Sequence, residues 1–212
     1  MVAYITKVPV CVACGEWGLG PLCLACRRRL RPGRAGVVSG VAVNYALHHS
    51  GTGRVLVHRL KYHGLAGAAD VLAAVMAPLV PSGVTAIVPV PRAAVRRVVY
   101  GIDPAWELAR RIGARTGVPV ARALAAPVWW PRHAGGSPQR RSAPRFRLRR
   151  PLLGPVALID DVVTSGATVR GALAALGAVD VTVVTATSPG MMVISKASTA
   201  SGRLRDSTAA WH

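Results

Sequence analysis

The chain has 212 residues, enough for one domain of good size and a small appendage. It carries 27 basic and 8 acidic residues, a formal net charge of +19, so its surface attracts polyanions such as phosphate compounds or nucleic acid. The longest uncharged stretch, Val71 to Pro91, holds four prolines and therefore does not predict a membrane-spanning helix. No apolar signal-peptide core precedes Cys11, and we expect a cytoplasmic protein without membrane insertion.

The four cysteines come first along the chain, as two C-x-x-C pairs separated by eight residues: Cys11, Cys14, Cys23 and Cys26. This spacing is typical of four thiolates around one structural Zn²⁺. A disulfide pair is the alternative, but a reducing compartment disfavours it.

After the cysteines, apolar patterning predicts an alternation of strands and helices. Strands are expected within 37–47, at 85–90, 120–124, 156–161 and 181–187, and helices at 52–62, 68–80, 103–115 and 169–176. Such alternation is typical of an α/β fold with a parallel sheet flanked by helices. The residues beyond Pro189 show no periodicity, and we expect a disordered tail.

The segment from Trp129 to Arg150 interrupts this alternation with many arginines and no acids, and predicts an extended basic loop. Aromatic rings can stack on bases while arginines contact phosphates, so the segment is a candidate for contact with single-stranded DNA. Packing of the tryptophans against the domain, with solvated arginines, is the alternative. The candidate residues are Trp129, Trp130, Arg132, Arg140 and Arg141.

The most informative pattern is the apolar run that begins at Val156 and ends in Asp160 and Asp161, followed by a small loop and a helix. Amides at a helix N-terminus favour an anion, and hydroxyls add donors. Paired carboxylates suit a vicinal diol or a metal ion. The pattern thus predicts a cradle for a ribose 5-phosphate, whose phosphate-binding residues are Thr164, Ser165, Gly166, Ala167 and Thr168.

Two conditions attach to this interpretation. The loop has to be open, and the two acids must face the ligand rather than turn inward into salt bridges. A strand–turn–helix whose acids only cap the helix is the structural alternative. No Walker-type or dinucleotide-type glycine motif offers a competing nucleotide site.

The segment Leu158 to Thr168 resembles the signature of type I phosphoribosyltransferases that binds phosphoribosyl pyrophosphate (PRPP). The resemblance implies that this fold binds PRPP with Mg²⁺, and that Asp160 and Asp161 serve catalysis. Val88 to Pro91 resembles the pyrophosphate-binding turn of the family. That likeness implies contacts from Pro89, Val90, Pro91 and Arg92, and Lys61 would face the anion by analogy; a solvated Lys61 at a helix end is the alternative.

An N-terminal four-cysteine module joined to a phosphoribosyltransferase-like domain resembles the layout of the ComF (competence) family. It implies a zinc module at 1–36, a phosphoribosyltransferase-like domain at 37–188 and a tail at 189–212. The activity implied is phosphoribosyl transfer from PRPP to an unidentified acceptor, with release of pyrophosphate. Two alternatives are a DNA-uptake accessory protein that handles single-stranded DNA or meets a DNA-processing protein, and a PRPP sensor without turnover. The sequence does not indicate the oligomeric state.

Overall fold

A computed structural model describes residues 10–18, 20–128 and 143–190. The strands are β1 (Ala35–Val38), β2 (Val41–His48), β3 (Ala86–Pro89), β4 (Leu124–Ala125), β5 (Arg147–Leu148), β6 (Val156–Val162) and β7 (Val181–Ser188). The helices are α1 (Leu24–Arg28), α2 (Gly51–His63), α3 (Ala66–Met76), the 3-10 turn η1 (Ala77–Leu79), α4 (Ala94–Tyr100), α5 (Pro104–Thr116) and α6 (Ala167–Leu176).

Five strands form the main sheet, in the order β1-β2-β7-β6-β3. All neighbours pair in parallel except β1 and β2, which form an antiparallel hairpin at one edge. Ser39 and Gly40 make the hairpin turn with φ values of 52° and 79°, and positive φ at both central positions matches the twist of paired strands. The predicted α/β fold with a mostly parallel sheet is confirmed.

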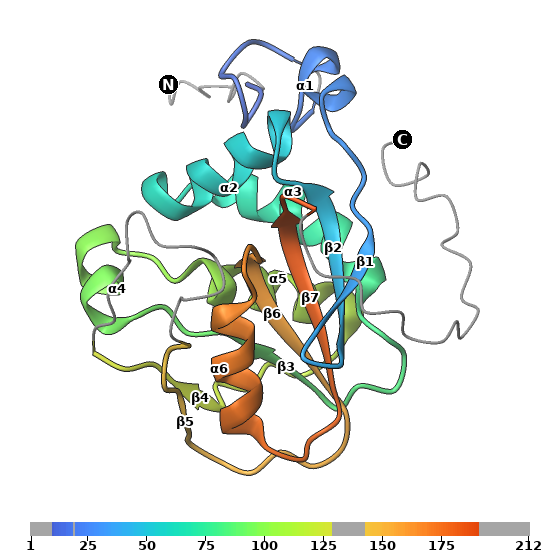
Figure 1. The fold of residues 1–212 in the computed structure, drawn as a ribbon. Coiled ribbons are helices and arrows are strands. Elements are labelled where there is room, and N and C mark those ends of the chain that lie inside the picture. Colours follow the sequence, from blue (N-terminus) through green and yellow to red (C-terminus); the bar gives the residue numbers. More distant parts are fainter. Residues whose placement is uncertain (1–9, 19, 129–142, 191–212) are drawn as a thin grey trace, which may run out of the picture.

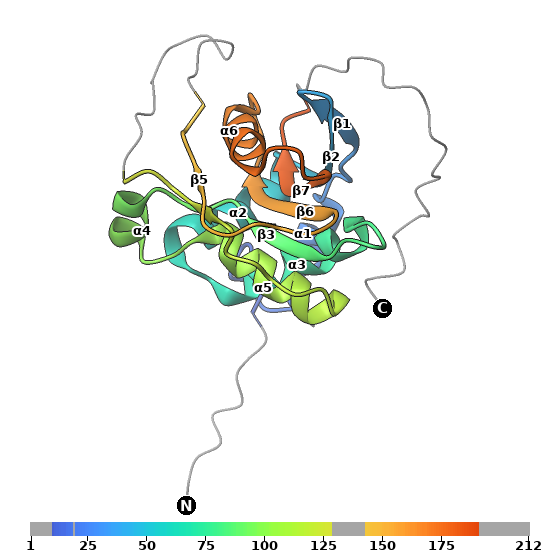
Figure 2. The same ribbon diagram turned by 90° about the horizontal axis from the view of Figure 1, so that it is seen from below.

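Helices cover both faces of the sheet, with α6 on one face and α3 and α5 on the other (Figure 2). The side chains of β6 alternate accordingly. Ala157 and Ile159 belong to the apolar cluster of α2, α3 and α5, whereas Val156 and Leu158 belong to the cluster of α6. Strand β6 is buried over nearly its whole length because both of its faces are covered.

The predicted helix after Asp103 is confirmed as α5, and its ends follow from local chemistry. The Asp103 side chain accepts a hydrogen bond from the Trp106 amide at 3.4 Å, and Pro104 occupies the first helical position. Gly117 ends the helix with a φ of 74°, a conformation that costs glycine little.

Two expectations differ from the structure. Residues 94–100 form helix α4, where the sequence predicted no helix; this helix buries none of its residues, so it leaves no apolar periodicity to detect. The strand expected at 120–124 is reduced to a bridge between Val120 and Ile87 and the two residues of β4. Strand β4 pairs with β5, which lies inside the segment expected to be an extended loop.

The cysteine segment lies beyond α2 at one end of the molecule, as Figure 1 shows. Cys11, Leu22 and Cys26 are buried in the same apolar cluster as α2 and α3. The Thr52 hydroxyl of α2 donates a hydrogen bond of 2.8 Å to the Cys26 carbonyl, and this contact is buried. The segment is therefore joined to the sheet domain by shared packing. Among the described residues, no helix is both long and apolar enough to cross a membrane.

Candidate functional site

The candidate site lies at the edge of the sheet where the parallel strands β3, β6 and β7 end, and Figure 1 shows α2 passing over this edge. Ligands of open parallel sheets bind beyond the carboxyl ends of the strands. Strand β6 passes through a four-residue loop into α6, as the sequence predicted. Gly166 in this loop has a φ of 71°, and an added Cβ would lie 2.8 Å from Cγ1 of Val38. Only glycine fits this turn without strain.

The loop is accessible and rich in unused donors. Thr164 is exposed, while Ser165 and Thr168 are partly exposed. Their three hydroxyls make no hydrogen bond to other described residues, and no side chain caps the N-terminus of α6. Arg170 donates from Nη1 to the Ser165 carbonyl at 2.8 Å, which places a guanidinium beside the loop. The first condition, donors open to an anion, is met for these three side chains, whereas Gly166 and Ala167 are buried.

The second condition is not met in this structure. Asp160 and Asp161 are only 8% and 9% exposed. Adjacent residues of a strand point to opposite faces, so Asp160 continues the α6 face and Asp161 the face covered by α2. Oδ1 of Asp161 forms an ion pair of 2.9 Å with Nζ of Lys61 on α2. A ligand that uses the Asp161 carboxylate therefore has to displace Lys61.

Burial shapes the chemistry of Asp160. It raises the pKa of this carboxyl to about 8; the neighbouring Asp161 charge adds to the effect, and Lys61 opposes it. Asp160 Oδ1 also accepts a hydrogen bond of 2.8 Å from the Asp161 amide. At neutral pH the pair thus holds one carboxylic acid and one carboxylate. The neutral acid can donate a hydrogen bond and the carboxylate can accept one, which suits two neighbouring hydroxyls.

The Pro-Val-Pro turn lies beside the end of β6, because the Val90 amide donates to the Ile159 carbonyl at 2.9 Å. Arg92 follows this turn, but its guanidinium is engaged. Nη1 donates to the carbonyls of Lys61 and Ile102 at 3.1 and 3.2 Å, and the guanidinium carbon lies 4.5 Å from the centre of the Tyr100 ring. Arg92 thus lies next to Lys61, as a shared anion site requires. In this structure, however, its hydrogen bonds connect α2 to the segment after α4.

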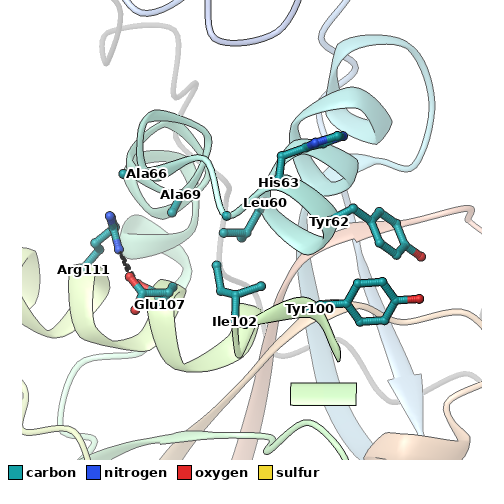
Figure 3. A pocket seen from close by; sticks show the side chains of 11 residues that line it. Leu60, Tyr62, His63, Ala66, Ala69, Tyr100, Ile102, Glu107 and Arg111 are labelled. Atoms are coloured by element: carbon teal, nitrogen blue, oxygen red, sulfur yellow. Dashed lines mark hydrogen bonds and ion pairs between the residues drawn. The ribbon is translucent and has the colours of Figure 1, made fainter. Parts of the chain in front are cut away.

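A cavity of about 450 Å³ adjoins this contact on the outer side of α2. Figure 3 shows Tyr62 and Tyr100 at one end of it and the ion pair of Glu107 with Arg111 at the other. The two tyrosine rings meet edge to face, with 5.2 Å between their centres. Neither Asp160 nor Asp161 lines this cavity.

His49 is a further residue at this edge that the sequence did not point to. Its Nδ1 lies 2.8 Å from the Thr187 hydroxyl of β7, and its amide donates to the Ser188 carbonyl at 2.8 Å. Four histidines between residues 48 and 63 gave no recognisable spacing. The long-range pairing of β2 with β7 is what brings His49, and not a neighbouring histidine, to the Thr187 hydroxyl. Arg170 was missed too, although a basic residue one turn into α6 is a local signal.

The four cysteines form the predicted cluster. All four Sγ atoms lie within 4.8 Å of one another, and those of Cys14 and Cys23 are 3.8 Å apart. A tetrahedron with Zn–S bonds of about 2.3 Å has edges of about 3.8 Å, whereas a disulfide bond measures about 2.05 Å. Although burial opposes its ionisation, backbone hydrogen bonds from Cys14, Cys23 and Ala13 lower the pKa of Cys11 to about 6. The donor set fits a closed structural zinc site, which leaves no position for a substrate.

The candidate nucleic-acid residues Trp129, Trp130, Arg132, Arg140 and Arg141 lie outside the described residues, as does most of the segment 189–212 expected as a tail.

The fold places the chain among α/β proteins with a mostly parallel sheet, with a loop and a helix N-terminus at the carboxyl edge of that sheet. No family model and no curated protein matches the chain. Among solved structures, that of orotate phosphoribosyltransferase from Aeropyrum pernix is similar at 15% sequence identity and a TM-score of 0.37. The match covers 78% of this chain and 90% of that one. The likeness is slight, and the fold class stands on the strand order and helix placement described above.

Replacing Asp160 with Asn is expected to stabilise the protein at pH 8 but not at pH 4. The folded protein retains the Asp160 proton up to about pH 8, whereas an unfolded chain releases it near pH 4, so wild-type stability falls as pH rises through this window. The expected gain at pH 8 is about 2 kcal/mol, measured by urea unfolding at both pH values. Asp161→Asn, which breaks the ion pair with Lys61, serves as the control and should not stabilise. An equal effect of Asp160→Asn at both pH values would contradict the assignment.

Removing the metal is expected to lower the melting temperature of the whole domain, because Cys11 and Cys26 share a cluster with α2 and α3. Elemental analysis should find one zinc per chain, and Cys11→Ser should reduce it. A chelator should destabilise the wild type but leave Cys11→Ser unchanged. Two disulfides in the protein purified under reducing conditions would overturn the zinc assignment.

Proposed function

We propose that the chain is a phosphoribosyltransferase-type protein that binds PRPP·Mg²⁺ and transfers its phosphoribosyl group to an acceptor, releasing pyrophosphate. One observation carries this proposal. Among the described residues, the loop from Thr164 to Thr168 gathers three hydroxyls without a hydrogen-bond partner and a helix N-terminus without a side-chain cap, shortly after two buried acids. The hydroxyls and the helix N-terminus suit a monoester phosphate, and the two acids suit the neighbouring sugar hydroxyls.

Each part of the site has a role in this proposal. Residues 164–168 hold the 5-phosphate, with Arg170 beside them. Asp160 and Asp161 hold the ribose hydroxyls, and the Asp161 carboxylate stabilises the positive charge that develops on the sugar as its bond to pyrophosphate breaks. Pro89, Val90 and Pro91 form the wall beside the leaving group, while Lys61 and Arg92 supply the charges nearest to it. The Mg²⁺ of the substrate neutralises part of the pyrophosphate charge.

The ion pair between Lys61 and Asp161 is compatible with this proposal only as a contact that the substrate exchanges. Pyrophosphate carries more negative charge than one carboxylate, so it competes for the Lys61 ammonium. Release of Lys61 frees Asp161 to accept from a ribose hydroxyl. PRPP would thus give Lys61 a phosphate and Asp161 a hydroxyl in place of their ion pair, so that neither buried charge is left unpaired.

The ComF resemblance and the domain division rest on the residues alone and are part of the proposal. In it, residues 1–36 hold structural zinc, residues 37–188 form the PRPP-binding domain and residues 189–212 follow as a tail. A cytoplasmic location agrees with the use of intracellular PRPP.

The proposal predicts that PRPP·Mg²⁺ binds the wild type and that Gly166→Ala and Asp161→Asn each weaken binding at least tenfold. The first change strains the phosphate loop, and the second removes a sugar contact. Calorimetry measures binding, and a coupled assay measures pyrophosphate release with a panel of bases. Ser82→Ala, on the exposed turn before β3 at the opposite end of that strand, is the matched control.

The outcomes separate the candidate functions. Binding with pyrophosphate release supports the transferase. Binding without release across the panel indicates a PRPP sensor. Failure of the wild type to bind PRPP would refute both.

A second function, binding of single-stranded DNA, is favoured by the surface of the cysteine segment. Trp17 is 74% exposed there, which is unusual for a large aromatic side chain. Residues 10–36 contain five arginines and one acid, and Arg28, Arg29 and Arg31 are exposed. Stacking on an exposed ring combined with arginine contacts to phosphate is the common mode of single-strand recognition.

If this surface binds DNA, Trp17→Ala should weaken binding of a labelled oligothymidine by about 1–3 kcal/mol, the contribution of one stacked base. Fluorescence anisotropy at 50 and 200 mM salt should show steeply weaker binding at the higher salt. Leu24→Ala removes another exposed apolar side chain of the same segment and should have little effect. Equal affinity of the wild type and Trp17→Ala would exclude this surface.

A further inference from the structure

His49 is held at the carboxyl edge of the sheet by two contacts with β7. Its amide donates to the Ser188 carbonyl, and its Nδ1 shares a hydrogen bond of 2.8 Å with the buried Thr187 hydroxyl. Thr187 in turn pairs in register with Val162, the residue after Asp161. The ring is therefore fixed against β7, the strand that lies between β2 and the strand that carries the acid pair.

These contacts commit only one nitrogen of the ring. Among the described residues, Nε2 of His49 has no hydrogen-bond partner. None of the buried side-chain nitrogen and oxygen atoms of these residues lacks a partner, so Nε2 is not fully buried. The ring is thus fixed through Nδ1 while Nε2 remains accessible. When Nδ1–H donates to Thr187, Nε2 carries a lone pair and can accept a proton.

Burial and the nearby cations disfavour a proton on this imidazole. Burial lowers the pKa of His49, Lys61 and Arg54 of α2 lower it further, and Asp161 of β6 opposes them. The contacts from β7 come from the uncharged groups of Thr187 and Ser188. These effects favour the free base of His49, and the influence of Asp161 shows that the two side chains lie on the same side of the molecule's carboxyl edge.

We infer that His49 is the general base of the transfer step, and that the acceptor is a neutral N–H or O–H compound which must lose a proton. The inference rests on the proposed function. In the step, the bond between the sugar C1 and the pyrophosphate oxygen breaks, and pyrophosphate leaves with the bonding electrons. The acceptor nitrogen or oxygen forms the new bond to C1, and its proton passes to Nε2 of His49. Water satisfies the same requirement, in which case the products are ribose 5-phosphate and pyrophosphate.

The test compares His49→Gln, Thr187→Val and His58→Gln with the wild type. Glutamine can still hydrogen-bond Thr187 but cannot take a proton at neutral pH, while valine removes the tether at nearly constant volume. His58 is an exposed histidine on α2 outside the site and serves as the matched control. PRPP binding is measured by calorimetry, and pyrophosphate release is followed from pH 5 to 9 with water alone and with purine and pyrimidine bases.

The inference predicts that His49→Gln binds PRPP within threefold of the wild type but releases pyrophosphate about 100-fold more slowly, in the range of a lost general base. In the wild type, kcat/KM should fall at acid pH, where the imidazole takes up a proton, and this limb should disappear in His49→Gln. Thr187→Val should reduce kcat about tenfold, and His58→Gln should match the wild type. NMR of the ring nitrogens at pH 7.5 should show the proton of His49 on Nδ1.

Each contrary result has a distinct meaning. Unchanged turnover in His49→Gln, a proton on Nε2 at pH 7.5, or PRPP binding by the wild type without any pyrophosphate release would overturn the role of His49 and leave PRPP binding standing. Failure of the wild type to bind PRPP would overturn the proposed function itself, and the inference with it.

Discussion

The ion pair between Lys61 and Asp161 joins helix α2 to the carboxyl end of β6, across 100 positions of the chain. Both side chains are largely buried, so neither charge can lose its partner without a replacement. Every function considered for this edge of the sheet depends on what replaces that contact. A polyanion with a sugar attached supplies both replacements at once, since its phosphates suit Lys61 and its hydroxyls suit Asp161. An anion without hydroxyl groups would leave the Asp161 carboxylate buried and unpaired.

The position of this contact follows from the sheet. Parallel pairing brings the ends of β3, β6 and β7 to one edge, and the β6–α6 connection places helix amides there. Gly166 permits that connection because its left-handed backbone leaves no room for a side chain beside Val38. On the other face, α2 lies on the apolar cluster shared with the cysteine segment and brings Lys61 above Asp161. The cysteine segment at one end of the molecule thus supports the helix that carries Lys61.

The local parts of this arrangement could be predicted from the sequence. The β6–loop–α6 unit, the Asp103 cap of α5 and the cysteine spacing are short-range patterns with direct physical causes. Helix α4 escaped prediction because it buries none of its residues. The pairing of Lys61 with Asp161, the role of Arg92 as a tie to the Lys61 and Ile102 carbonyls and the contact of His49 with Thr187 also escaped. Each of these joins residues that are distant in sequence, and only the packed sheet brings them together.

The account depends most directly on where PRPP lies when it binds, and a crystal structure of the protein grown with PRPP·Mg²⁺ would measure this. We expect the monoester phosphate within hydrogen-bond distance of the amides of residues 165–168, and the Lys61 ammonium moved from Asp161 to the pyrophosphate. A phosphate bound elsewhere, or an intact contact between Lys61 and Asp161 beneath a bound sugar, would contradict it.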